Sequence, residues 1–170
     1  MAALPRTLKN MNVFVDTHSW AGVASKVSQP KIKKKTEDHR GAGMLGDVAL
    51  DLGYEKLEMD ITYAGFDVRQ YRQLGRCGTS DLPIRYVGAY ERQDTCTIQN
   101  VEIYVRGQAV ELDPGEAELG SKSEIKMNYS LTYYRLEVDG VVEVELDFIN
   151  GIEMFAGTDV AQEIKRMLGL

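Results

Sequence analysis

Hydrophobic and polar positions alternate along most of this chain, a pattern typical of β-strands that bury one face and expose the other. The alternation is strict at residues 57–63, 84–90, 101–105 and 142–146, and it is longest at residues 125–133. After Tyr133 and Tyr134 its phase flips, so that Leu136 and Val138 occupy the apolar face. A flip inside one strand indicates a bulge or a bend from one sheet into another.

Turn signals join some of these runs into hairpins. Asp139-Gly140 separates two alternating segments, and this dipeptide is the strongest short-range hairpin signal. A second hairpin is expected from residues 11–16 to residues 20–27, with its turn at 17–19. The sequence therefore predicts seven or so antiparallel strands.

Two short segments follow the helical period instead. Asp67 and Gln70 have the spacing of a capping box, which predicts a helix that ends at Gly75. Its apolar side chains, expected on one face, are Val68, Tyr71 and Leu74. A second helix is expected from Asp159 to Gly169, with apolar positions Val160, Ile164, Met167 and Leu168.

These elements predict a single domain, residues 1–170, of the mainly β class. Two packed antiparallel sheets would form a small β-barrel or sandwich, with one central and one C-terminal short helix. A chain of 170 residues is long enough to bury its own core.

Residues 28–53 interrupt the alternation and are interpreted as one extended loop. A loop of this length in a compact domain is usually functional or disordered. This one is too apolar for a solvated linker, so a binding partner is expected for it. Residues 107–122 are expected to form a second, acidic loop through Asp113-Pro114-Gly115. The apolar positions of the first loop are Ile32, Met44, Leu45, Val48, Leu50 and Leu52.

The composition, 44% hydrophobic and 27% charged, is that of an ordinary soluble domain. No apolar run approaches the roughly 20 residues that span a bilayer, and the first residues lack the apolar core of a signal peptide. Cys77 and Cys96 are too few for a disulfide framework, so free thiols in a reducing cytoplasm are expected.

The net charge of −6 conceals an asymmetry. Residues 1–40 have eight basic and three acidic side chains, a balance of +5, whereas the remainder has twelve basic and twenty-three acidic, a balance of −11. Unlike patches on one chain favour head-to-tail association, because they steer encounter and set the register. An unevenly charged but solvated surface is the alternative.

The motifs that suggest catalysis or cofactor binding lack the required context. Gly41-Ala-Gly43-Met-Leu-Gly46 matches Gly-x-Gly-x-x-Gly, but a dinucleotide site needs a strand before and a helix after it, and neither is expected here. His18 and His39 have no partner at a metal-ligand spacing. No enzyme activity, metal or cofactor is therefore expected.

A lysine cluster begins the long loop, at Lys31, Lys33, Lys34 and Lys35. Such a cluster contacts phosphates in nucleic-acid-binding proteins. Acidic residues follow it directly and no aromatic residues interleave for base stacking, so an acidic protein surface is the favoured partner. A nucleic-acid-binding module and a monomeric ligand-binding β-barrel remain the alternatives.

Short motifs in collinear order extend over essentially the whole chain. They include Met11-Asn-Val-Phe, Pro30-Lys31, Arg40-Gly-Ala-Gly-Met44, Asp51-Leu-Gly53, Pro83-Ile-Arg-Tyr86, Glu111-Leu-Asp-Pro-Gly115, Tyr134-Arg-Leu136 and Leu168-Gly-Leu170. Together they resemble the major tail tube protein of contractile-tailed phages, the FII type. Related tubes belong to R-type bacteriocins and to type VI secretion.

The resemblance implies a structural subunit, not an enzyme, that forms hexameric rings stacked into a hollow tail tube. DNA and protein would pass through it into the host when a sheath contracts. The implied partners are further copies of the chain, the tail sheath protein, the baseplate or tail initiator, the tail terminator and the tape measure protein, with DNA transiently in the lumen. The chain would belong to the virion, assemble in the host cytoplasm and have no membrane anchor. A headless R-type bacteriocin or a type VI-like device is the alternative.

Two sets of candidate site residues follow from this interpretation. The expected inter-subunit contacts join the basic loop to acidic surface, through Lys31, Lys33, Lys34, Lys35, Arg40, Gly41, Gly43, Met44, Glu111, Asp113, Glu116 and Glu118. The expected lumen residues lie on the polar faces of strands: Glu58, Asp60, Thr62, Glu102, Lys126, Asn128, Ser130 and Thr132. An acidic lumen would repel DNA phosphates and keep the genome from adhering.

Overall fold

The computed structural model describes residues 4–169, so the last residue of the Leu168-Gly-Leu170 motif lies outside it. Strands predominate over two short helices, as the alternation predicts. In chain order the elements are β1 (Arg6–Val15), β2 (His18–Ser19), β3 (Ala24–Ser28), β4 (Lys34–His39), β5 (Val48–Tyr54), β6 (Leu57–Ala64), α1 (Val68–Leu74), β7 (Leu82–Arg92), β8 (Thr97–Asp113), β9 (Glu124–Val138), β10 (Val141–Asp147), β11 (Ile152–Phe155), β12 (Thr158–Asp159) and α2 (Gln162–Leu168).

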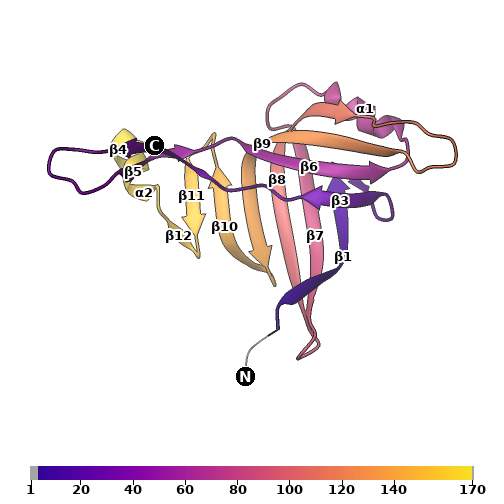
Figure 1. Cartoon of the computed structure of the whole chain (residues 1–170), viewed down its shortest axis with the longest axis horizontal. Coiled ribbons are helices and arrows are strands. Elements are labelled where there is room, and N and C mark those ends of the chain that lie inside the picture. The colour runs from indigo at the N-terminus through magenta and orange to yellow at the C-terminus, as the bar shows by residue number, and fades with distance from the viewer. Residues whose placement is uncertain (1–3, 170) are drawn as a thin grey trace.

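Ten strands belong to one antiparallel sheet, in the order β12-β11-β10-β9-β8-β7-β1-β2, with β6 added to β9 and β3 added to β6. The sheet folds over itself. Figure 1 shows β3, β6 and the first part of β9 crossing above the row formed by β1, β7, β8 and β10. Strands β4 and β5 pair only with each other and project to one side (Figure 1). We call the ten-stranded part with α1 the body, and residues 34–54 the arm.

The fold depends on the bend in β8 and β9, which pair along almost their whole length. On its other edge, β9 pairs with β6 up to Leu131 and with β10 from Tyr133. The register of the β8–β9 pair shifts between Arg106 and Gly107, opposite this point. A Cβ at Gly107 would lie 2.0 Å from the carbonyl oxygen of Ser130, so the close approach of the two backbones requires glycine. The predicted phase flip is therefore confirmed as a bulge at a bend between layers.

The core lies between the two layers and is filled by side chains. Strand β6 buries Leu57, Met59, Ile61 and Tyr63 in strict alternation. The hydroxyl groups of Tyr63 and Tyr129 lie 3.1 Å apart in the interior. The sheet is open, so a sandwich-like arrangement replaces the closed barrel. An open sheet with a filled core does not favour the alternative of a ligand-binding β-barrel.

Local turn and capping signals were reliable. Asp139 and Gly140 both have left-handed φ angles, 50° and 82°, and they join Val138 to its partner Val141. The capping box of α1 is present, with the Asp67 carboxylate accepting from the backbone N–H of Arg69 at 2.8 Å. The helix at the C-terminal end begins at Gln162, and Gly169 ends it in the left-handed conformation.

Three predictions about segments were wrong, and in the first two cases pairing with a strand outside the predicted segment decided the outcome. The N-terminal hairpin is limited to two residue pairs, since residues 24–28 pair with β6 instead. Residues 107–113, predicted as loop, extend β8 and pair with β9. Residues 28–53 are not one loop, since they contain β4 and most of β5.

The apolar face of helix α1 is directed to solvent. Gln70 and Gln73 are buried, whereas Val68, Tyr71 and Leu74 are exposed. The glutamines are tolerated inside because they have hydrogen-bond partners: Gln73 accepts from the Tyr129 hydroxyl at 2.7 Å, and the Gln70 oxygen accepts from the backbone N–H of Asp67 at 3.3 Å. Periodicity located the helix but could not show which face the body covers.

Candidate assembly surfaces

Six of the eight candidate lumen residues share one polar face. The pairing of β6 with β9 sets Glu58 opposite Ser130, Asp60 opposite Asn128, and Thr62 opposite Lys126. Directly opposed residues in an antiparallel pair project from the same side of the sheet. This side is the outward one, because the intervening residues of both strands are buried. We call these six residues the β6–β9 polar face.

Charges on this face are partly neutralised. The Asp60 carboxylate accepts from the Asn128 amide at 2.7 Å and lies 3.1 Å from the Lys126 ammonium. Partial burial raises the pKa of Asp60, but these two partners outweigh it and hold the pKa below its usual value. Glu58 pairs with Lys56 at 2.7 Å. The face is therefore polar without a large excess of negative charge.

Two acidic residues expected at an inter-subunit contact border the same face. Glu111 pairs with Asn128 and Asp113 pairs with Lys126 across β8 and β9. Together with Asp60 they line a surface cavity of about 150 Å³. The negative charge of this region therefore comes largely from β8. Glu116 and Glu118, the other two acidic candidates, lie exposed in the loop between β8 and β9.

The remaining two lumen candidates lie elsewhere. Glu102 projects from the other layer, where the Arg85 guanidinium and the Tyr104 hydroxyl, at 2.6 Å, donate to its carboxylate. Burial raises the pKa of Glu102, but these donors and Asn100 lower it by more, so the pKa lies below its usual value. Thr132 lies at the bulge, with its hydroxyl 2.6 Å from that of Ser80. The eight candidates therefore do not form one continuous surface.

The arm is exposed on both faces. Apolar Val48, Leu50 and Leu52 alternate along β5, and their exposed fractions are 48%, 47% and 53%. These side chains lack the second layer that normally covers the apolar face of a strand. Without such a layer, a two-stranded hairpin is only marginally stable in water. Sequence reasoning noted the apolar residues but missed the strand, because flanking glycines and charges conceal an alternation of only three positions.

Part of the positive charge of residues 31–40, at the start of the arm, is satisfied within the chain. Lys33 pairs with Glu55 at 2.6 Å, and Lys34 pairs with Asp51. The Lys34 ammonium lowers the pKa of the Asp51 carboxyl. Among residues 4–169, Lys31, Lys35 and Arg40 have no carboxylate within ion-pair distance. The lysine cluster is thus divided between pairs that shape the arm and cations that face solvent.

The base of the arm is fixed to the body at Tyr54. Its ring stacks on Phe148 with centroids 5.9 Å apart, and its hydroxyl donates to Glu153 at 2.6 Å. Burial and the neighbouring carboxylate together raise the pKa of Tyr54. The backbone N–H of Glu55 donates to the carbonyl of Lys33 at 2.8 Å, which closes the hairpin. The arm is therefore anchored at one end and free beyond it.

The glycine motif of the arm forms the turn between β4 and β5. Gly43 has φ +87°, and the N–H of Met44 donates to the Gly41 carbonyl at 3.2 Å. A strand does precede the motif, contrary to expectation, but an antiparallel strand follows it instead of a helix. This arrangement has no helix N-terminus to receive a phosphate.

Both helices expose apolar side chains that the body does not cover. On α1, Val68, Tyr71 and Leu74 join the exposed Phe66, whose ring centroid lies 5.5 Å from that of Tyr71. On and beside α2 the exposed apolar residues are Val160, Ile164, Met167 and Leu168. Within residues 4–169, neither helix has the length and apolar character needed to cross a membrane.

The sequence matches the model of one protein family, described as phage tail tube protein FII, over residues 5–169. The chain belongs to this family. It is 41% identical to the tail tube protein of Escherichia phage P2, with 99% of each chain covered. It is 34% identical to the major tail tube protein of Serratia phage KSP20, over 88% of this chain and 87% of that one. It is therefore a contractile tail tube subunit and a component of the virion.

Solved structures show the same fold at low sequence identity. A chain of the anti-feeding prophage cap superposes with a TM-score of 0.61 at 10% identity, covering 81% of this tail tube subunit and 93% of that chain. A chain of the PVC sheath–tube complex in the extended state superposes with a TM-score of 0.58 at 12% identity, covering 78% and 91%. This chain thus shares its folded-over sheet with these two chains.

Proposed function

We propose that this tail tube subunit forms hexameric rings that stack into a hollow tube, through which DNA and protein pass into the host when a sheath contracts. The observation that supports this most directly is the arm. It exposes an apolar strand that its own body does not cover. A second copy of the chain supplies the missing layer, as expected for head-to-tail association, which generates rings or open helical stacks.

Free sheet edges also support self-assembly. The outermost strands of the sheet, β2, β3 and β12, each have an unpaired side. Unpaired strand edges are templates for pairing with another chain. In the proposed ring the sheets of neighbouring subunits continue one another, and the β6–β9 polar face lines the lumen.

The proposed partners follow from the family and from the solved relatives. Those relatives come from a sheath–tube complex, a baseplate and a tube-terminating cap. For this subunit we infer corresponding contacts with a tail sheath protein, a baseplate or tail initiator, and a tail terminator. The tape measure protein and, transiently, DNA occupy the lumen. Assembly takes place in the host cytoplasm.

Removal of the arm tests the proposal. Lys34 and Tyr54 are a paired position at the base of the hairpin, so residues 35–53 can be replaced by Asn-Gly without disturbing the contacts of Tyr54 with the body. We expect the shortened chain to fold with an unchanged thermal unfolding midpoint. Electron microscopy should then show loss of tubes. Full-length tubes from this variant would refute the role of the arm.

Two further variants separate the contribution of the apolar side chains to assembly from that of the charged ones. Replacement of Val48, Leu50 and Leu52 by serine should abolish tubes, whereas replacement of Lys31, Lys35 and Arg40 by glutamine should only slow assembly and reduce its salt dependence. The reverse ranking would show that charge, not the apolar strand, holds the rings together.

The lumen assignment needs its own test. Glu58→Lys with Glu111→Lys adds positive charge at exposed positions and leaves the Asp60–Lys126–Asn128 cluster intact. If the β6–β9 polar face lines the channel, tails with these substitutions should retain DNA and eject it more slowly, because cationic side chains bind phosphates. Unchanged ejection from normal tails would refute the assignment.

A further inference from the structure

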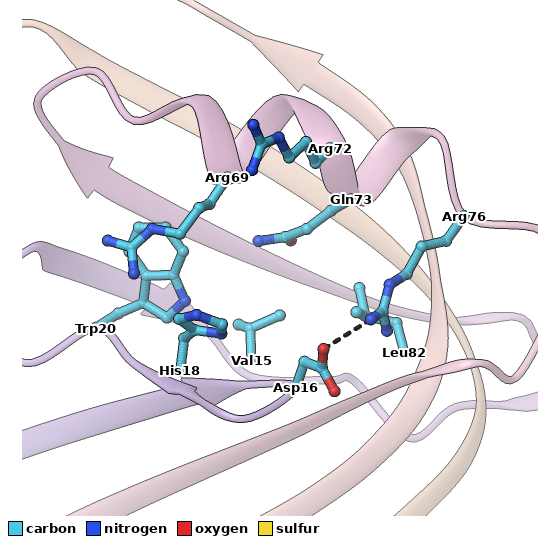
Figure 2. Close-up of a pocket in the computed structure, with 9 residues that line it drawn as sticks. All are labelled: Val15, Asp16, His18, Trp20, Arg69, Arg72, Gln73, Arg76 and Leu82. Carbon is cyan, nitrogen blue, oxygen red and sulfur yellow. Dashed lines mark hydrogen bonds and ion pairs between the residues drawn. The ribbon is translucent and has the colours of Figure 1, made fainter.

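A cavity of about 230 Å³ lies between α1 and the strands beneath it. Figure 2 shows the residues that line it, with three arginines from α1 and its C-terminal end above, and Val15, Asp16, His18 and Trp20 below. None of the residues expected to act in assembly lines this cavity. We propose that it binds a carboxylate group.

The first support is an unpaired donor in its wall. Trp20 is 2% exposed, and its indole N–H has no hydrogen-bond acceptor among the described residues. Burial of an unsatisfied N–H costs on the order of 1–3 kcal/mol, so such groups are rare unless something pairs with them. In Figure 2 the indole nitrogen lies on the edge of the ring that faces the cavity, beside His18. His18 is exposed, and its Nδ1 lies 3.4 Å from the Thr17 hydroxyl.

A second buried donor points the same way. Gln73 is 9% exposed, and its side-chain oxygen is occupied by the Tyr129 hydroxyl at 2.7 Å. This contact fixes the orientation of the amide, so its NH₂ group extends into the cavity toward Trp20 (Figure 2). Two neutral donors held by the core therefore border one space, and the indole N–H of Trp20 is buried there without an acceptor among the described residues.

The charges around the cavity select a monoanion. Arg69 is paired with Asp67 and stacks over the Trp20 ring at 4.9 Å. Arg76 donates to Asp16 at 2.7 Å. Arg72 lies exposed on the cavity rim, and no carboxylate of residues 4–169 lies within ion-pair distance of it. One unpaired guanidinium with two neutral donors matches a carboxylate, whereas the Asp16 carboxylate in the wall disfavours a dianion such as phosphate.

The carboxylate has two possible sources, an acidic side chain of a protein packed against α1 in the assembled tail or a free carboxylate in solution. Trp20 is the single tryptophan of the chain, so its indole group gives one signal in a ¹H–¹⁵N spectrum. This signal reports on the N–H that the proposal invokes. It can be followed in the unassembled subunit and, by solid-state NMR, in tubes.

The first arm of the experiment titrates unassembled subunit with sodium acetate, against sodium chloride at the same ionic strength. A saturable shift of the indole signal with acetate alone supports the proposal. Arg72→Gln should then raise the half-saturating concentration by about tenfold, since a charge-assisted hydrogen bond is lost. Arg166→Gln, on the exposed surface of the other short helix, is the matched control and should change nothing.

The second arm compares the indole signal in tubes without acetate, and it alone rests on the proposed function. A shift on assembly that Arg72→Gln abolishes and Arg166→Gln preserves identifies a protein side chain as the source. Absence of any Arg72-dependent shift, both with acetate and in tubes, overturns the proposal. So does a stronger response to inorganic phosphate than to acetate. Failure to form tubes would count against the proposed function and leave the acetate result decisive.

Discussion

Strands β5 and β6 follow one another in the chain, and both alternate apolar and polar residues, yet only β6 buries its apolar face. Leu57, Met59, Ile61 and Tyr63 of β6 are almost fully enclosed. Val48, Leu50 and Leu52 of β5 remain about half exposed. The difference lies in what covers each strand, since β6 faces a second layer and β5 has only β4 beside it. Alternation therefore specifies a strand, while the surrounding fold, or a partner chain, decides whether its apolar side is buried.

The largest difference in stability between body and arm is expected for substitutions of glycine by alanine. Gly107→Ala in the body would place a Cβ 2.0 Å from a backbone oxygen, whereas Gly46→Ala in the arm meets no atom within 4 Å. We expect the first to lower the free energy of unfolding by about 3 kcal/mol or more and the second to change it by less than about 0.5 kcal/mol. Chemical denaturation measures both, and equal effects would contradict the close β8–β9 approach.

Side-chain truncation gives the direct test of the two strands. Ile61→Ala in β6 should cost about 2–5 kcal/mol, because it leaves a cavity in a closed core. Leu50→Ala in β5 should leave the isolated subunit within about 0.5 kcal/mol of wild type and impair tube assembly instead. Thermal unfolding and electron microscopy give the two readouts. A large stability loss for Leu50→Ala would mean that the arm packs on its own body.

Acid unfolding should depend on the turn between β10 and β11. Asp147 is buried, and it accepts from the backbone N–H groups of Ile149 and Asn150 at 3.0 and 2.9 Å. Burial raises the pKa of Asp147, but these bonds, the Asn150 amide and Arg106 lower it below its ordinary value of 3.8. A lowered folded-state pKa adds stability above the unfolded-state pKa, which is lost as the pH falls through the folded-state value.

Asp147→Asn should therefore cost about 1–2 kcal/mol at pH 7, and its deficit relative to wild type should shrink below about pH 4. Urea unfolding across pH 2–7 measures the difference. Asp47→Asn in the turn of the arm, where the exposed carboxylate accepts no hydrogen bond from residues 4–169, is the control expected to match wild type at pH 7. A deficit for Asp147→Asn that is constant with pH would contradict the assigned role.

The smallest effect should come from an ion pair at the base of the arm. Lys33→Ala removes the pair with Glu55, which is exposed on both sides. Exposed pairs contribute about 0–1 kcal/mol and are screened by salt. We expect a change below about 0.5 kcal/mol in low salt and none in 0.5 M sodium chloride. A larger change would indicate that charge, more than backbone pairing, shapes the base of the arm.

Much of the body could be predicted from the sequence. The Asp139-Gly140 turn, the capping box at Asp67 and the phase flip after Tyr133 all gave correct elements, because each depends on interactions within a few residues. The alternation also predicted correctly that the polar residues of β6 and β9 project from the solvent side of their strands. Successive side chains of a strand point to opposite faces, so burial of the apolar residues exposes the polar ones.

Long-range pairing could not be predicted in the same way. Residues 24–28 pair with β6 and not with β1. Residues 107–113 extend β8 because they pair with β9. The buried side of α1 depends on Gln73 reaching the Tyr129 hydroxyl, a partner 56 positions away. The carboxylate-binding cavity is lined by residues of elements from β1 to β7. The sequence did not indicate this site, because its arginines are typical of the solvated face of a helix.

The undivided course of β9 has a mechanical consequence. Its one edge is bonded to β8 throughout, while its other edge is shared between β6 and β10. Tension applied to the upper layer through β6 or to the lower layer through β10 therefore reaches the same strand. The β8–β9 ladder continues through both layers, so the layers cannot come fully apart while it is intact, even when β6 or β10 separates from β9.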